Sequence, residues 1–319
     1  MIDGDLLISV TELYERGLYL QAHEAALSHA PLRDWRGGAA RALAGRLARH
    51  LGSGRMARWH HLIAFREDPA DFAARYYYSW ATMERRGPYP AWRLLQTLGE
   101  PSSAVAAHRA EWYALCAHVT VLLRDFDAAD QWIARALDTA PDDPWIHVTR
   151  SYVLQCEDRY DEAYAAARES LRLCPWHRPA VQAIGDLLPM MNRDHDAIAF
   201  LAEAAPQIES AVVWAQLATL QVELEDFAAA RASFEQVERH WPLADKDATR
   251  WLAGERSTIA YRLGEVDRAI ELAKASENPY FVEIAARLAD PARNNSRRIS
   301  LPVGFVRQHH VTCAPATLT

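Results

Sequence analysis

The amino-acid sequence predicts an all-α superhelix of about eight antiparallel helix pairs, followed by a short extended tail. Pairs of small residues twelve positions apart recur seven times, and the alanines that end them lie 33 to 39 residues apart. Apolar residues recur at helical spacing on both sides of a polar turn. A proline closes most units, because proline cannot extend a helical hydrogen-bond ladder. The seven pairs are Gly45/Ala57, Ser79/Ala91, Ala117/Ala129, Ser151/Ala163, Gly185/Ala197, Ala218/Ala230 and Ser257/Ala269.

The unit at residues 111–141 predicts two helices joined by a tight turn. A polar break at Arg124 and Asp125 separates two apolar stripes, and Pro141 ends the second one. Each stripe advances in steps of three or four residues, which places its members on one face of a helix. The first stripe contains Trp112, Leu115, Val119 and Leu122, and the second contains Phe126, Ala129, Ile133, Ala136 and Leu137.

The small pairs predict where the two helices of each unit cross. Two helices approach closely only where their facing side chains are small, and a larger residue would overpack the crossing. The first unit departs from the rule, since Val10 stands twelve positions before Ala22. A terminal unit packs on one side only, so it tolerates this change. At the other end, residues 279–288 (PYFVEIAARL) predict a final helix that covers the stack.

Over roughly residues 5–290 this pattern resembles the tetratricopeptide repeat family, most closely at residues 211–242, which contain Trp214, Ala218, Ala230 and Pro242. The resemblance implies a right-handed superhelix that binds a protein or peptide on its concave face, which the first helix of each pair lines. The alternative is that some of these residues belong to the core. The family register places on that face Arg46, Arg49, Tyr76, Trp80, His118, Trp145, Tyr152, Trp251 and Tyr261, together with Met83, Glu111, Gln155, Gln182, Asp186 and Thr258.

Composition excludes several other functions. The net charge of −7 argues against general affinity for nucleic acid, and no run of 18 apolar residues predicts a membrane span. The first residues carry two aspartates and no basic leader, and the four cysteines are scattered, so we expect a cytoplasmic protein with reduced thiols. The sequence contains no glycine-rich phosphate loop, paired-carboxylate motif or Cys-x-x-Cys pair, and we therefore expect no cofactor.

Two local features favour a binding site only weakly. Residues 33–61 contain seven arginines and one acid, a local charge of +6 that would suit an acidic segment or a phosphate group. A solvated helix face is the alternative. His60 and His61 are adjacent, so on a helix they point in different directions and do not easily ligate one metal ion. We expect surface or core histidines and no metal site.

After Asp290 the repeat pattern stops. Residues 299–319, ISLPVGFVRQHHVTCAPATLT, predict a strand-like segment, because β-branched and apolar residues are bounded by proline and glycine. The second half resembles the opening of papain-like cysteine peptidases, most closely the double-glycine leader peptidases. The resemblance implies that Gln308 is an oxyanion-hole donor and Cys313 the nucleophile. The match departs from the family in two ways: Cys313 lies five positions after Gln308, where the family has six, and Ala314 replaces glycine.

The sequence thus predicts a helical repeat domain at residues 1–291, a linker at 292–298 and a peptidase-like stub at 299–319. The main functional hypothesis is a scaffold that binds a partner protein, a peptide or its own missing C-terminal domain. The alternative is the accessory region of a cysteine peptidase, of which this chain would be a fragment. We expect no activity from the chain itself, because no histidine or acid follows Cys313 to activate the thiol.

Overall fold

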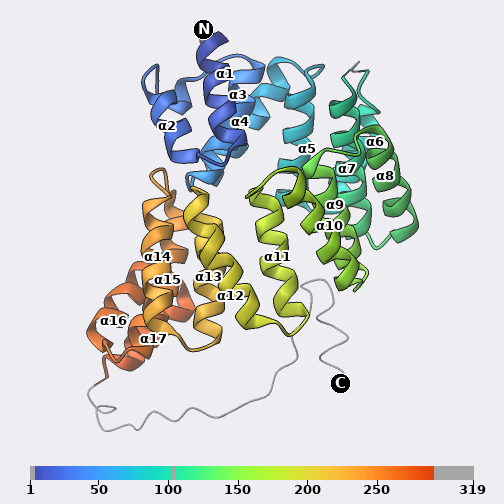
Figure 1. The fold of residues 1–319 in the computed structure, drawn as a ribbon. Helices are drawn as coiled ribbons and strands as arrows, with labels where there is room; N and C mark the ends of the chain where they lie inside the picture. Colours follow the sequence, from blue (N-terminus) through green and yellow to red (C-terminus); the bar gives the residue numbers. More distant parts are fainter. Residues whose placement is uncertain (1–3, 103–104, 291–319) are drawn as a thin grey trace.

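The computed structural model describes residues 4–102 and 105–290, and these residues form seventeen α-helices and two short 3-10 helices (Figure 1). The first sixteen α-helices make eight antiparallel pairs, and α17 follows the last pair. The first helices of the pairs are α1 (Gly4–Glu15), α3 (Gly38–His50), α5 (Phe72–Arg86), α7 (Ala106–Leu122), α9 (Pro144–Cys156), α11 (Arg178–Met190), α13 (Ala211–Glu223) and α15 (Lys246–Arg262). The second helices are α2 (Tyr19–Leu27), α4 (Gly54–Glu67), α6 (Pro88–Leu98), α8 (Phe126–Thr139), α10 (Tyr160–Leu173), α12 (Asp194–Ala204), α14 (Phe227–Arg239) and α16 (Val266–Ala275).

The predicted helix pairs and the final helix are confirmed. The structure places α17 at Pro279–Leu288, the range that the apolar pattern gave. The 3-10 helices are η1 (Leu32–Asp34) and η2 (Ala205–Gln207). No helix in the described part of the chain is long and apolar enough to cross a membrane. The linker and the peptidase-like stub lie outside the described residues.

All fourteen members of the small pairs are buried between the two helices of their units. In the last unit the two members are bonded to each other, because the Ser257 hydroxyl donates to the Ala269 carbonyl oxygen at 2.8 Å. A side chain at Gly185 would place its Cβ 2.9 Å from Leu201 of the partner helix. These distances explain why the sequence keeps one small residue on each helix of a unit.

The hydrophobic core continues along the stack instead of forming one centre. Its largest buried side chains come from successive units, including Leu47, Trp112, Ile184 and Phe234. Four apolar clusters follow one another, each built from neighbouring pairs. Each pair therefore depends on its neighbours for burial, as expected of a solenoid.

Aspartates start many of the helices. Five helices are preceded by an aspartate whose side chain accepts a hydrogen bond from a backbone N–H in the first turn. That N–H has no partner within the helix. The turns before several second helices contain residues with positive φ, among them Arg124 at 63° and Glu225 at 62°. The capping aspartates are Asp71, Asp125, Asp143, Asp226 and Asp245.

Replacing Asp226 with alanine is expected to lower the free energy of unfolding by about 1 kcal/mol. The Asp226 carboxylate accepts from the Ala229 N–H at 3.1 Å, and alanine leaves that donor at the start of α14 without its partner. Urea denaturation followed by circular dichroism measures the change. Asp226→Ser is the matched control, because serine also caps helices. Equal midpoints for the two variants would contradict the capping role.

The superhelix curves until its beginning meets its second half. In Figure 1 the lower ends of α2 and α4 lie beside the loops that precede α13 and α15. Hydrogen bonds join these segments, for example from the Leu243 N–H to the Leu51 carbonyl oxygen at 2.9 Å. The concave side of the superhelix is therefore bordered by both halves of the chain.

Candidate functional site

A pocket of about 790 Å³ lies among the first helices of the pairs. Its walls come from α5, α7, α9, α11 and α13, the first helices of five consecutive pairs. This volume falls within the range of pockets that hold a small ligand or a few residues of a peptide. Four of the nine residues proposed for binding line it, namely Trp80, His118, Trp145 and Tyr152, and so do Gln155, Gln182 and Asp186.

One end of the pocket is aromatic. The ring of His118 stacks on Tyr152 with centroids 4.3 Å apart, and it also meets Trp80 at 4.7 Å. Trp145 meets Trp80 edge to face at 6.0 Å, and its indole N–H donates to the Tyr76 hydroxyl at 3.1 Å. Tyr76 itself is buried below the pocket wall and does not line it. Because the rings hold one another in place, this end offers a rigid apolar surface.

The other end of the pocket is polar. Arg178 lies there at the start of α11, and Glu223 lies at the end of α13. The Gln216 amide crosses from α13 to α11, where it donates to the Gln182 carbonyl oxygen at 2.9 Å and to the Asp186 carboxylate at 2.6 Å. The arrangement presents charges of both signs beside the side-chain amides of Gln155 and Gln182, and amide groups of this kind can bond to a peptide backbone.

Asp186 has an unusual protonation equilibrium. Asp186 is exposed where it lines the pocket, yet the protein atoms close to its carboxylate bury it enough to limit its hydration. This burial raises the pKa of Asp186 to about 6, although the bond from Gln216 opposes the rise. At neutral pH this carboxylate is still mostly ionised, and it lies beside the neutral amide of Gln216.

Five of the proposed binding residues do not line this pocket. Arg46 pairs with Glu15 at 2.7 Å, and Arg49 pairs with Glu84. Trp251 lies on α15 against Trp241, with ring centroids 5.7 Å apart. The others are Tyr76, described above, and Tyr261 near the end of α15. The family register placed these residues on first helices, where they lie. However, Arg46 and Arg49 form ion pairs within the protein, and Tyr76 is buried in the core.

The arginine-rich segment is partly neutralised by acids outside it. Besides the pairs of Arg46 and Arg49, the Arg41 Nε donates to both carboxylate oxygens of Glu67, at 3.0 and 2.9 Å. Three of the seven arginines thus bond to acids that lie outside residues 33–61. The charge of this segment serves contacts among the first helix pairs and is not all available to a ligand.

His60 and His61 are core residues of α4. His60 is fully buried, and only 7% of His61 is exposed. Burial lowers the pKa of His60 to about 4 and that of His61 to about 3, and nearby arginines lower both further. Both rings are therefore neutral in the folded protein. The described residues contain no group of three or more His, Cys, Asp or Glu side chains arranged to hold a metal ion.

Sequence reasoning missed Arg178, Gln216 and Glu223. Arg178 is the first residue of α11, and the family register starts further along that helix. The register also placed no residue of α13 on the binding face. Gln216 could have been found from the repeat, because it lies 34 residues after Gln182 and so occupies the equivalent position of the next first helix. Gln308 and Cys313 lie outside the described residues.

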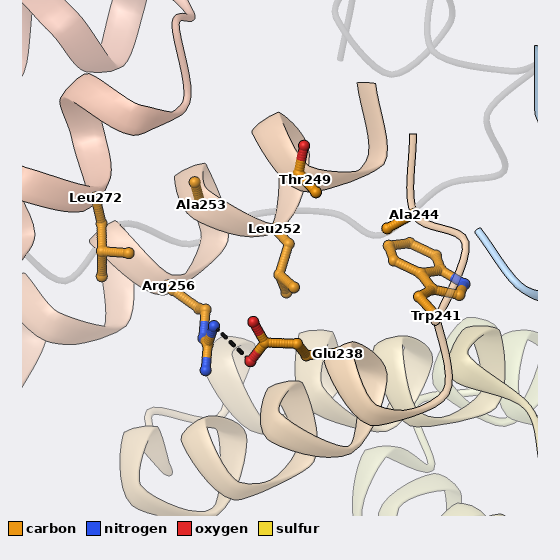
Figure 2. Close-up of a pocket in the computed structure, with 8 residues that line it drawn as sticks. All are labelled: Glu238, Trp241, Ala244, Thr249, Leu252, Ala253, Arg256 and Leu272. Atoms are coloured by element: carbon orange, nitrogen blue, oxygen red, sulfur yellow. Dashed lines mark ion pairs between the residues drawn. The ribbon is translucent and has the colours of Figure 1, made fainter. Parts of the chain in front are cut away.

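A second pocket of about 190 Å³ lies among α14, α15 and α16, and Figure 2 shows it in detail. Arg256 closes one side by pairing with Glu238 at 2.9 Å, and Trp241 comes from the loop before α15. This volume is below the usual range for ligand pockets. The larger pocket is therefore the candidate site.

No model of a protein family matches the chain, and no curated protein matches it. Among solved structures it is similar to PilF of Pseudomonas aeruginosa, with 16% identity, 70% of this chain and 97% of that chain covered, and a TM-score of 0.48. A tetratricopeptide repeat protein from Parabacteroides merdae shows 14% identity, coverage of 86% and 98%, and a TM-score of 0.48. PilW, a type IV pilus biogenesis factor, shows 16% identity, coverage of 68% and 96%, and a TM-score of 0.49. The helix pairs described above, and not these alignments, establish the all-α solenoid.

Proposed function

We propose that this protein is a scaffold that binds a short segment of a partner protein in its concave pocket. The observation that carries the proposal is the position of the pocket, which spans the first helices of five consecutive pairs and combines an aromatic end with a polar end. A groove of this kind suits a peptide, because aromatic walls hold an apolar side chain while amide groups bond to the backbone.

The charges that line the pocket restrict the chemical class of ligand that it suits. Among the described residues that line the pocket, Arg178 is the one arginine or lysine, and Asp186 and Glu223 are the acids. Such a surface favours a segment of mixed polarity over a nucleic acid, whose phosphates would need several cations. The proposed partner is thus a protein or peptide, and we retain the cytoplasm as the proposed location.

Replacing Trp80 and Tyr152 together with alanine is expected to weaken peptide binding by about tenfold or more, because aromatic anchors dominate such interfaces. Peptides selected against the wild-type chain from a displayed random library are the probes, and fluorescence anisotropy measures their affinity. Trp251→Ala is the matched control, since Trp251 is 40% exposed but lies outside the pocket.

A second variant fills the pocket without removing any packed side chain. Thr219 is exposed and lines the pocket, so Thr219→Trp should block entry and leave the fold intact. If the double alanine variant, Thr219→Trp and Trp251→Ala all bind the selected peptides as the wild type does, the pocket is not the binding site.

The peptidase alternative depends on Gln308 and Cys313 and remains a prediction from sequence. Its test is the coding sequence that follows Thr319. A histidine followed by an aspartate or asparagine in a β-rich continuation would support a cysteine peptidase, whose repeat region would then recruit substrate.

A further inference from the structure

The first helix pairs contact the second half of the chain at three places. The bonded residues are far apart in sequence, by 189 positions for Leu20 and Glu209 and by 159 positions for Tyr19 and Arg178. Figure 1 shows the ends of α2 and α4 beside the loops that precede α13 and α15. Among the described helices, none of the first four packs along α12, α13, α14 or α15, so helix ends and loops make the contact.

Glu209 makes the first contact and caps α2 from a distance. Its carboxylate accepts hydrogen bonds from the Leu20 N–H at 2.7 Å and from the Gln21 side-chain amide at 3.0 Å. Its own backbone N–H donates to the Gly17 carbonyl oxygen at 3.1 Å. The residue before α2, Leu18, provides no side-chain cap. A carboxylate from the second half of the chain therefore supplies what the local sequence lacks.

Asp245 makes the second contact and caps two helices with one carboxylate. One oxygen accepts from the Asp247 and Ala248 N–H groups of its own helix, α15. The other oxygen accepts from the Arg55 N–H, at the start of α4, at 3.1 Å. The backbone adds a bond from the Asp245 N–H to the Gly52 carbonyl oxygen at 3.0 Å. The start of α15 is thus joined to the start of α4.

Arg178 makes the third contact, and it connects the first helix pair to the pocket. Its Nε donates to the Tyr19 hydroxyl at 3.0 Å, and the Tyr19 ring stacks on His50 at 4.1 Å. Arg178 also lines the concave pocket. Its Nη1 also donates to the Gln182 side chain in the pocket, so one guanidinium joins the first helix pair to the pocket wall.

We propose that the first two helix pairs, residues 4–67, form a latch that opens and closes the superhelix at the mouth of the pocket. Neighbouring helix pairs bury apolar faces along their whole length, and that packing is costly to separate. Between the described helices, the latch contact has no such lengthwise packing. Hydrogen bonds at helix ends are accompanied there by a small apolar contact, in which Ile208 lies against Gly17 and Leu243 packs on the core of the first pairs. A contact of this limited size separates at lower cost than two packed helix pairs. Opening moves the latch away from the loops before α13 and α15, while α3 and α4 stay packed on α5, and it breaks the hydrogen bond between Arg178 and Tyr19.

Amide hydrogen exchange of the full chain tests the latch without any ligand, so the result does not depend on what the pocket binds. In Glu209→Ala, the backbone N–H groups of Leu20 and Gln21 lose the carboxylate oxygen that accepts from both, and their exchange should rise by about tenfold. Because a latch opens as a unit, exchange at Arg55, Leu243 and Asp245 should rise with it. Helices α7 and α8, far from the contact, should not change.

Glu203→Ala is the matched control, since Glu203 is an exposed acid on the neighbouring helix α12, and its exchange pattern should equal that of the wild type. Tyr19→Phe gives a second measurement if Glu209→Ala folds poorly, because it removes one hydroxyl and retains the stacked ring. It should also accelerate exchange at Leu243 and Asp245. If the rise in either variant stays within residues 17–21, or if no rise occurs, the three contacts are independent and the latch does not exist.

Discussion

Replacing Gly45 with valine is expected to lower the free energy of unfolding by about 3 kcal/mol. A Cβ at this position would lie 2.3 Å from two ring atoms of His61 and 3.1 Å from the Ala57 carbonyl oxygen. His61 is buried, so its ring cannot swing into solvent. The crossing of α3 and α4 would have to widen, and the apolar contacts beside it would be lost. The urea midpoint, followed by circular dichroism, measures the change.

Gly38→Ala is the control for this substitution because it lies in the same helix. A Cβ at Gly38 would meet only the Asp71 carboxyl group, at 3.9 Å, which is an ordinary contact. Its midpoint should equal or exceed that of the wild type, since alanine favours helix. Adding His61→Ala to Gly45→Val should recover part of the loss, because the two side chains compete for one space. No loss in Gly45→Val would mean that the small pair does not set the helix spacing.

Acidification from about pH 7 to about pH 5 is expected to cost about 2 kcal/mol of stability for each of His60 and His61. Both pKa values are lowered in the folded state, to about 4 and about 3, chiefly by burial. In the unfolded chain a histidine takes up its proton near pH 6.5, so in this window the unfolded state binds more protons. Stability therefore falls as the pH falls below the unfolded value. Urea denaturation at each pH measures the slope.

Two variants separate the groups that produce this slope. His60→Leu should reduce the loss by about 2 kcal/mol, because leucine cannot bind the proton. Glu111 acts in the opposite direction, since burial and nearby Asp143 raise its pKa to about 7. It binds a proton on folding within the same window, and its contribution is lost as the pH rises through 7. Glu111→Gln should therefore steepen the loss on acidification. If neither variant changes how the free energy of unfolding depends on pH, other titrating groups cause that dependence.

The helix pairs could be predicted because their cause is local and repeated. Each crossing needs one small residue on each helix, and this need leaves a mark in every unit, from Gly45 and Ala57 to Ser257 and Ala269. The final helix at Pro279–Leu288 was predictable for a similar reason, because its proline, apolar stripe and length are contained in ten residues.

The candidate site was only partly predictable. Trp80, His118 and Tyr152 meet in one pocket because they occupy equivalent positions on successive first helices, each directly after the small residue of its unit. Trp145 joins them from two turns earlier on α9, the helix of Tyr152. Trp251 follows the same register, but the pocket ends at α13, two helices earlier. The extent of the pocket depends on the curvature of the whole stack, and curvature accumulates from small rotations that no single unit records.

The ion-pair partners of individual arginines could not be predicted from the sequence either. The sequence gives no sign that Glu15 and Glu84, in different units, neutralise Arg46 and Arg49. Long side chains choose among several neighbours, and the choice depends on side-chain packing that periodicity does not describe. This is why a basic segment in the sequence became a set of internal ion pairs in the structure.

The carboxylate of Asp245, shared between α4 and α15, has a consequence for how this protein can change in evolution. An open solenoid can gain or lose a repeat in its middle, since each repeat touches only its neighbours. In this chain an additional helix pair between α5 and α12 would rotate and displace Asp245 and Glu209 away from the helix ends that they cap. The number of repeats is therefore fixed by the geometry of closure, much as the number of strands is fixed in a closed barrel.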